Sequence, residues 1–390
     1  MKIVVLGGLG QMGRIITRDL VQTCKGCEII VADRDEKKAK KFANSFKRKT
    51  VKGAVVDITN HQDLVNILNS TKVVIASIPY KLNLNVMNAA LEAKCNYLDL
   101  GGLFHMTRKQ LKLHKKFRNK GLTAVLGCGS TPGTTNVMAR YGADLLDRIH
   151  EINITFAAYD KTKYKTHFVV PYSMYTVFDE FSDKPAVFTN GKLKFVKPLS
   201  GEGEIIFPDP IGKVTGYYTL HSELATFPSS FKNKGLKECW FKVTFDPDFV
   251  HDVKLLIEAG LGSTEYINVG RQKVRPIDVT VKELNRLIPK GNVKVNDMEY
   301  IRVIMRGQRN GKNVELTLDS VAHSNPKWNV SAGAINTGVP PSIIAQMIAK
   351  GQVKQKGVLP PEICIEPKIF FDELSERNIK VYQTLKEQIN

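Results

Sequence analysis

The chain has 390 residues, of which 43% are hydrophobic, and it carries a formal net charge of +19. This length and composition suffice for two ordinary cores, and they exclude a disordered or repetitive protein. No apolar run approaches the ~18 residues that a membrane span needs, and a strand pattern begins at once without a basic leader. We therefore expect a cytoplasmic protein that does not enter a membrane.

Neither the cysteines nor the basic residues predict a special binding site. Six cysteines in so long a chain do not predict a disulfide framework, and a single Cys-x-x-Cys at Cys24 and Cys27 is a poor zinc site, so no metal is expected. Basic residues concentrate in two helix-like stretches, 34–52 and 108–120. These stretches have the pattern of solvated faces and lack the interleaved aromatic side chains of a nucleic-acid platform. The non-enzymatic alternative is a protein that senses a cofactor and binds nucleic acid.

Residues 2–33 have the pattern of a strand, a glycine turn, a helix and a second strand that ends in a carboxylate. The turn matches Gly-x-Gly-x-x-Gly. Its first glycine allows a tight turn, its second lets the backbone approach a pyrophosphate, and its third lets helix and strand pack closely. The amide groups and dipole at the helix start favour phosphate. The residues expected to hold a dinucleotide here are Gly8, Gly10, Gln11, Met12 and Gly13.

The end of the second strand predicts which dinucleotide binds. Asp33 lies 20 residues beyond Gly13, where a carboxylate accepts hydrogen bonds from the two ribose hydroxyls of NAD and repels a 2′-phosphate. Arg34 could hold that phosphate if the carboxylate turned away. NAD is therefore the expected cofactor, and NADP is not excluded. Asp57, at the end of the third strand, is expected either to touch the adenine or to cap the next loop.

Beyond Asp33, helical patterns alternate with short apolar strands. Continuous apolar strands between helices predict a parallel sheet covered on both faces, here an α/β Rossmann doubly wound sheet of six strands. After the helix that ends near Asp147, apolar and polar residues alternate with a period of two, as at 152–158, 239–245 and 301–305. This predicts an α+β domain with a mostly antiparallel sheet. Pro340 and Pro341 are expected to open a further helix, and 379–381 a strand.

Five segments along the chain resemble the saccharopine dehydrogenase family, most closely its lysine 6-dehydrogenase type. They are Ile78-Pro79-Tyr80, 97–102, 127–136, His221-Ser222-Glu223 and 357–362. The resemblance implies a dinucleotide domain at 1–130 that the C-terminal segment 336–390 completes, and a substrate-binding and dimerisation domain at 131–335.

The family resemblance also implies an activity. The protein is expected to be a homodimeric NAD(P)-dependent oxidoreductase that passes a hydride from an amine-bearing carbon of a small amino-acid substrate to nicotinamide. The resulting imine is then hydrolysed or cyclised. The alternative is an NADPH-dependent imine reductase that condenses an aldehyde with an amine, as in saccharopine or carboxynorspermidine synthesis.

This chemistry needs a proton acceptor and sites around the substrate. Asp99 follows the fifth strand at the ligand-binding edge, where it could bind a ribose, accept a proton or only satisfy its loop. His221 and Glu223, two residues apart in an extended segment, would face one side. The carboxylate could then orient the imidazole and raise its pKa, or bind the substrate ammonium. A surface ion pair is the structural alternative.

The remaining candidates lie at the rim of the predicted site. Cofactor contacts are expected from Ser77, Ile78 and Pro79 after the fourth strand and from Gly101 after the fifth. Arginine binds a carboxylate through two hydrogen bonds, and Thr131 offers a hydroxyl in the loop at the start of the second domain. The expected substrate-binding residues are Tyr80, which could instead only pack, Thr131, Arg271 and Arg275.

Overall fold

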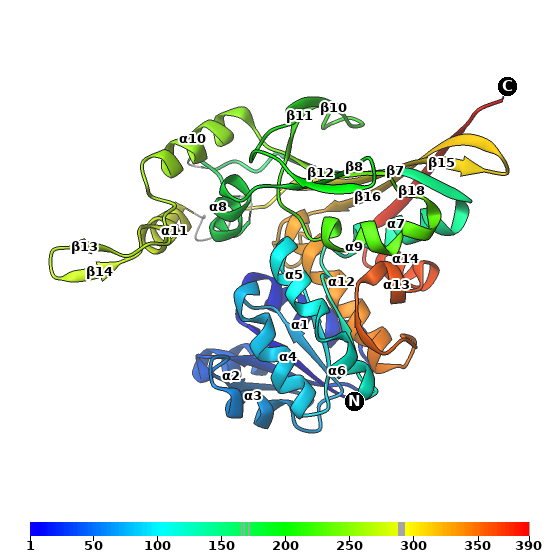
Figure 1. Cartoon of the computed structure of the whole chain (residues 1–390). Coiled ribbons are helices and arrows are strands. Elements are labelled where there is room, and N and C mark those ends of the chain that lie inside the picture. Colours follow the sequence, from blue (N-terminus) through cyan, green and yellow to red (C-terminus); the bar gives the residue numbers. More distant parts are fainter. Residues whose placement is uncertain (165, 167, 171, 288–292, 390) are drawn as a thin grey trace.

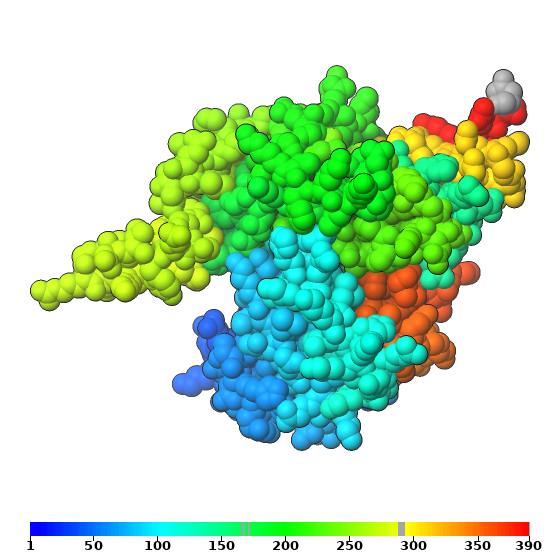
Figure 2. Space-filling model, in the orientation of Figure 1, coloured from blue at the N-terminus to red at the C-terminus, as the bar shows by residue number. Residues whose placement is uncertain are grey.

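The structure is a computed structural model, and it describes residues 1–164, 166, 168–170, 172–287 and 293–389. The chain forms two lobes, each built on its own sheet (Figure 1). We call them the parallel-sheet lobe, drawn below, and the mixed-sheet lobe, drawn above. In the space-filling view the two lobes meet along a broad junction (Figure 2).

The parallel-sheet lobe contains seven strands in the order β17-β6-β5-β4-β1-β2-β3. All neighbouring pairs are parallel, and the order reverses between β1 and β4, as in a doubly wound fold. The predicted fold class is confirmed, with one strand more than the sequence predicts. The strands are β1 (Lys2–Leu6), β2 (Glu28–Asp33), β3 (Val51–Val55), β4 (Val73–Ala76), β5 (Asn96–Asp99), β6 (Thr123–Val125) and β17 (Gly357–Leu359).

Helices cover both faces of this sheet because its strands are apolar on both sides. Ile3 and Val5 belong to one buried cluster with α1, whereas Val4 and Leu6 belong to another with α3 and α4. The helices of this part are α1 (Gln11–Thr23), α2 (Glu36–Asn44), α3 (His61–Leu68), α4 (Asn83–Glu92), α5 (Leu103–Leu111) and α6 (His114–Asn119), with a 3₁₀ turn at Tyr80–Leu82.

The mixed-sheet lobe follows α7 (Thr134–Leu145) and has the strand order β10-β11-β12-β7-β15-β16-β18, with β8 and β9 beside β12. Its pairs are antiparallel except β12 with β7. Alternate residues of β12 are buried, which confirms the period-two interpretation. The strands are β7 (Arg148–Asp160), β8 (Ala186–Thr189), β9 (Lys192–Phe195), β10 (Gly203–Ile206), β11 (Lys213–Tyr218), β12 (Glu238–Thr244), β15 (Asp297–Arg309), β16 (Lys312–His323) and β18 (Lys380–Glu387).

Four helices and an arm complete this lobe. The helices are α8 (Met174–Ser182), α9 (Glu223–Ser230), α10 (Pro247–Glu258) and α11 (Pro276–Leu287), with a 3₁₀ turn at Lys232–Lys234. The arm is the two-stranded hairpin of β13 (Ile267–Val269) and β14 (Gln272–Val274), which projects from the body at the left of Figure 2.

The C-terminal part of the chain lies in both lobes. β17 pairs with β6, and α12 (Ala332–Ala349) packs against α1, so this part extends the parallel-sheet lobe. The last strand departs from the expected boundary, because β18 pairs with β16 of the mixed sheet. Between them lie α13 (Pro361–Cys364) and α14 (Pro367–Glu376).

Helix α12 does not begin where the sequence predicts. Ser331 caps it by accepting a hydrogen bond from the Ala334 N–H, so Pro340 and Pro341 lie in its interior. Interior prolines remove main-chain hydrogen bonds at a cost. Nearly every side chain of α12 is buried between the two lobes, and this packing stabilises a helix that local preference disfavours.

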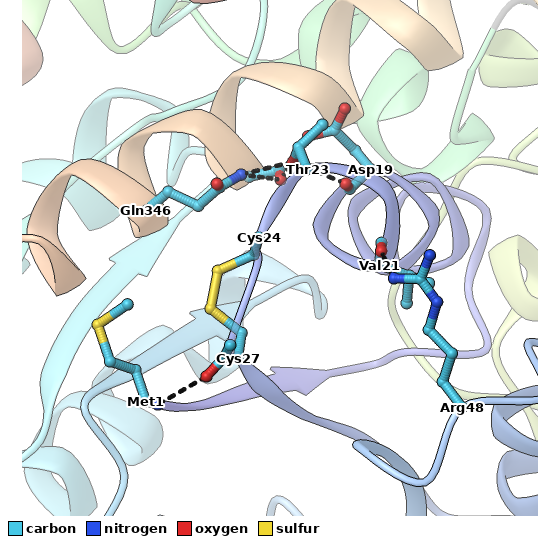
Figure 3. Close-up of a disulfide and its surroundings, with 10 residues drawn as sticks. Met1, Asp19, Val21, Thr23, Cys24, Cys27, Arg48 and Gln346 are labelled. Atoms are coloured by element: carbon cyan, nitrogen blue, oxygen red, sulfur yellow. Dashed lines mark hydrogen bonds between the residues drawn. A yellow bond between two sulfur atoms is a disulfide. The ribbon is translucent and has the colours of Figure 1, made fainter.

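A local disulfide joins Cys24 and Cys27 just after α1 (Figure 3). Beside it the Gln346 side chain of α12 donates a hydrogen bond to the hydroxyl of Thr23 over 2.8 Å, which ties the C-terminal helix to α1. The other four cysteines are free and buried: Cys95, Cys128, Cys239 and Cys364. Within the described residues, no helix is long and apolar enough to cross a membrane.

Candidate active site at the junction of the lobes

The glycine turn between β1 and α1 forms a cradle that a side chain would fill. A Cβ on Gly13 would lie 2.2 Å from the carbonyl oxygen of Gly7, so helix and turn are in contact there. Gly10 is the N-cap of α1 and no side chain caps it, which leaves the N–H groups at Gln11 and Met12 facing the turn as in a phosphate site. These residues fit the pyrophosphate of a nicotinamide dinucleotide.

The left-handed residue of this turn is Gly7, with φ of +70°, and not Gly8. A Cβ on Gly7 would lie 2.1 Å from the carbonyl oxygen of Ser77, at the end of the neighbouring strand β4. Gly7 is therefore required both for the turn and for the close approach of the two strand ends. The signal was present in the sequence as a pair of adjacent glycines.

Asp33, Arg34 and Asp57 lie together at the carboxyl ends of β2 and β3. The Asp33 carboxylate accepts hydrogen bonds from the N–H of Leu9 over 3.0 Å and of Arg34 over 2.8 Å, so it is turned toward the backbone. Asp57 accepts from the Thr59 hydroxyl and N–H, and these bonds, with the charge of Arg34, lower its pKa. The structure thus gives Asp57 the loop-capping role, while the Arg34 side chain is exposed at this edge.

The segment after β4 lies beside the glycine turn, since the Ser77 N–H donates to the Leu6 carbonyl over 3.1 Å. Ile78 and Pro79 continue this rim. The Tyr80 hydroxyl donates to Asp179 of α8 over 2.7 Å, and burial together with this carboxylate raises the pKa of Tyr80. Tyr80 therefore links the two lobes through the hydroxyl that substrate was expected to use.

Asp99 is surrounded by donors, which favours the alternative that it satisfies its loop over the role of a proton acceptor. One of its oxygens accepts from the Gly101 and Gly127 N–H groups over 3.0 and 2.8 Å. The other accepts from Asn83, Tyr97 and Gln110, and the side chain is 1% exposed. These bonds tie Asp99 to the loops after β5 and β6 and hold those loops in place.

The loop between β6 and α7 packs on that same framework. Gly101 and Gly127 both have positive φ, and both face the ring of Pro132. Thr131 precedes this proline and is half-buried. A small cavity between the lobes is lined from one side by Gly127 and Pro132 and from the other by Ser222.

The central ionisable pair of the junction is His221 with Glu223. The imidazole Nδ1 lies 2.5 Å from Glu223 Oε2, and the other oxygen of Glu223 accepts from the Thr135 hydroxyl over 2.7 Å. The ring of His221 stacks on Phe241 with centroids 3.7 Å apart. Both members of the pair are buried, which rules out the surface ion pair. The contact arises in a helix start and not in an extended segment, because Glu223 is the first residue of α9.

The electrostatics of this pair favour a proton carrier. Burial alone would lower the pKa of His221, yet the carboxylates of Glu223 and Glu180 raise it above its ordinary value. Since Nδ1 is held by Glu223, Nε2 is the atom that can exchange a proton with a ligand.

Glu180 and Tyr172 belong to the same buried group and were not predicted. The Tyr172 hydroxyl donates to Glu180, and burial raises the pKa of that carboxyl to about 7, although the charge of His221 opposes the rise. Glu180 lies on α8, where a single acidic residue gives no sequence signal, and its position depends on the packing of α8 against the sheet.

A second unpredicted group is Glu299 of β15 with Asn336 of α12. The Asn336 side-chain N–H donates to Glu299 over 2.9 Å, and both residues are buried. Burial raises the pKa of Glu299 to about 7. Burial and the charge of Glu180 raise the pKa of Tyr172, and the charge of Glu299 adds to that rise, so the two groups are electrostatically coupled. A signal was available here, because Glu299 interrupts the apolar face that continues at Ile301 and Val303.

Arg271 and Arg275 are not brought to this junction. Arg271 lies at the exposed turn of the projecting hairpin, and Arg275 forms a two-bond ion pair with Asp278 over 2.7 and 2.8 Å. Their positions therefore do not favour the expectation that they hold a substrate carboxylate at this junction. Among the described residues, no group of three or more His, Cys, Asp or Glu could hold a metal ion.

Two family models together match almost the whole chain. Residues 3–125 match the saccharopine dehydrogenase NADP binding domain, and residues 129–379 match the saccharopine dehydrogenase C-terminal domain. The structure is similar to that of apo histidine-tagged saccharopine dehydrogenase (L-Glu forming) from Saccharomyces cerevisiae, with a TM-score of 0.77 and 16% identity over 99% of each chain. At this identity the likeness shows the shared fold.

Two curated relatives are similar over most of their length. Carboxyaminopropylagmatine dehydrogenase of Synechocystis sp. is 25% identical, covering 98% of this chain and 97% of the relative. Carboxynorspermidine synthase of Vibrio cholerae is 24% identical, covering 90% of this chain and 89% of the relative.

Proposed function

Because the chain belongs to the saccharopine dehydrogenase family, we propose that it is an NADPH-dependent imine reductase that joins an amino-acid aldehyde to a primary amine. Family membership makes it a nicotinamide-dependent oxidoreductase of amino compounds. The proposal adds the direction of reaction and the kind of product, a secondary amine that carries a carboxyl group. The names of the two curated relatives favour this alternative over a lysine 6-dehydrogenase.

The observation that carries the proposal is the buried His221–Glu223 pair above the carboxyl ends of the parallel strands. Imine reduction consumes a proton: the aldehyde and amine condense with loss of water, and the imine then gains a hydride at carbon and a proton at nitrogen. The cofactor, when bound in the glycine cradle, supplies the hydride. In this proposal His221, protonated and oriented by Glu223, donates the proton from Nε2.

The surrounding residues keep His221 in that state. Thr135 fixes Glu223, and Phe241 stacks on the imidazole, so the ring has one orientation. Two carboxylates, Glu223 and Glu180, raise the pKa of His221 and thus favour the protonated form that a reductase needs.

We propose NADP as the cofactor, which departs from the expectation of NAD. The matching domain family is described as NADP binding, and the exposed Arg34 side chain is available for a 2′-phosphate while Asp33 is bonded to the backbone. Running each assay with NADPH and with NADH decides between them by the ratio of kcat/KM.

The test is a panel of reactions with the purified protein, followed by the absorbance of the reduced cofactor, which falls in imine reduction and rises in lysine oxidation. The panel pairs an amino-acid semialdehyde with agmatine or 1,3-diaminopropane, pairs 2-oxoglutarate with lysine, and offers lysine with NAD⁺ for the dehydrogenase alternative. We expect turnover with the semialdehyde and amine. Turnover only of lysine with NAD⁺, or none in the whole panel, would refute the proposal.

Variants then test the role of the buried pair. His221→Asn is expected to lower kcat by about 100-fold or more, the range of lost proton transfer. Glu223→Gln should lower the pKa of His221, so that the decline of kcat with rising pH begins at lower pH. The matched control is the exposed pair of His61 and Glu92, 2.8 Å apart. H61N and E92Q should leave kcat and its pH profile unchanged.

A further inference from the structure

The Glu299–Asn336 pair has an unused acceptor at its centre. A carboxylate only accepts hydrogen bonds, so the Asn336 amide must turn its N–H toward Glu299 and its oxygen away. That oxygen has no partner in the structure, although Asn336 is 0% exposed. Buried polar atoms are almost always paired, so this oxygen is free to accept a hydrogen bond from a ligand or a water molecule.

Two further acceptors lie beside it on the same helix. Pro340 and Pro341 have no N–H, so the main-chain carbonyls of Asn336 and Thr337 lack the hydrogen bond that a residue four positions later normally donates. Gly333, one turn earlier, leaves the space in which a Glu299 oxygen sits, since a Cβ there would lie 2.5 Å from that oxygen. Residues 333–337 of α12 thus contact a carboxylate and carry an unpaired amide oxygen and two main-chain oxygens that lack their usual helical partner.

The charge around the pair is negative as well. Asp160 and Asp297 are directly opposite each other on β7 and β15, and Asp297 is two residues along the strand from Glu299. Like charges placed opposite across a ladder repel each other, and a cation relieves that repulsion. The charge of Glu299 also raises the pKa of Tyr172, whose hydroxyl donates to Glu180, and the charge of His221 acts on Glu180 in turn.

We propose that Glu299 and Asn336 bind the second ammonium group of a diamine or polyamine whose first nitrogen reacts beside His221. An ammonium has three N–H donors and no acceptor, which matches a carboxylate, an amide oxygen and a freed main-chain carbonyl. The inference deepens the proposed function, on which it rests for the reacting nitrogen, by naming the substrate class as an amine with at least two positive charges.

The experiment compares two amines of equal length in the NADP⁺-bound protein by calorimetry: 1,3-diaminopropane, and 3-amino-1-propanol, in which a hydroxyl replaces one ammonium. Wild-type protein should bind the diamine about 10- to 100-fold more tightly, the range of a charge-assisted hydrogen bond. Glu299→Gln keeps the shape of the side chain and should reduce that preference to about threefold or less. Asn336→Ser, which replaces the carboxamide with a shorter hydroxyl, should reduce the preference for the diamine as well.

The matched control is Glu362→Gln. Glu362 is also a buried carboxylate bonded to an asparagine, Asn136, but its oxygens are all partnered. E362Q should therefore keep the preference for the diamine. Equal affinity of wild-type protein for the two amines, or a preference that survives in E299Q, would overturn the inference. Selective diamine binding without turnover in the panel would refute the imine reductase and leave the cation site standing.

Discussion

Two buried asparagine–glutamate pairs lie near the junction of the lobes, and they differ in how many of their atoms are used. In the first, Asn136 donates to Glu362 over 2.7 Å, and its own oxygen accepts from the Gly133 N–H over 2.8 Å. Ser230 donates to the second oxygen of Glu362. In the second pair, Asn336 donates to Glu299, and its oxygen has no partner.

The difference separates a structural network from a binding group. A complete buried network stabilises one arrangement of the chain, whereas an incomplete one costs free energy until a ligand completes it. Residue type alone would assign both pairs the same role. The unpaired oxygen makes Asn336 a candidate for binding, and the full set of partners makes Asn136 a structural residue.

Removing each asparagine should give the largest difference between the two pairs. Asn136→Ala leaves a buried carboxylate and the Gly133 N–H without their partner, so the free energy of unfolding should fall by about 3–5 kcal/mol. Asn336→Ala also leaves Glu299 without its amide donor, but it strands no main-chain N–H and removes an oxygen that is already unpaired, so its loss should be smaller, about 1–3 kcal/mol. Urea denaturation at pH 7 measures both. Equal losses would contradict the distinction.

The dependence of stability on pH sharpens the description of the second pair. Burial raises the pKa of Glu299 from 4.5 to about 7, so the folded protein holds this proton more tightly than the unfolded chain does. The associated stability is present below pH 4.5 and is lost as the pH rises through about 7. Between pH 5 and 8, wild-type protein should lose up to about 3 kcal/mol relative to Glu299→Gln. Parallel stability curves for the two proteins would contradict the raised pKa.

Gly333 and Gly133 offer the most specific test, in which the smallest effect on stability is expected at Gly333. At Gly333 an added Cβ meets only the end of the Glu299 side chain, and alanine favours a helix by about 0.5–1 kcal/mol. Gly333→Ala should therefore keep or raise the thermal midpoint while weakening diamine binding several-fold. At Gly133 an added Cβ would lie 2.1 Å from a main-chain oxygen, with φ of +133°. Gly133→Ala should lower the midpoint strongly. A lower midpoint in G333A would indicate a structural role for that site too.

The parts of the fold that sequence predicts are those set by local pattern. The apolar run of β4, the alternation of β12 and the glycine turn each specify their element through contacts near in sequence. The start of α12 could not be predicted in this way. Its interior prolines are tolerated because both lobes bury the helix, which is a property of the whole molecule.

The candidate site shows the same limit. His221 and Glu223 are two residues apart, and their contact was predictable. The hydrogen bonding of Asp99 was not, because its donors come from five positions between residues 83 and 127. Glu180 and Glu299 reach the junction only through the packing of α8 and the register of β15. The sequence pattern at the end of a parallel strand predicts a polar residue at that edge of the sheet. Contacts with residues distant in the sequence decide whether that residue is free to react.

The last strand, β18, has a consequence for how the protein can be divided. The chain leaves the parallel sheet at α7, returns to it with α12 and β17, and leaves again to place β18 against β16. Neither lobe is therefore encoded by one continuous stretch. A fragment that ends before α12 would expose the apolar faces of two cores at once, and truncation by about ten residues would open an edge of the sheet that carries Glu299. No single cut of the chain therefore separates one lobe from the other.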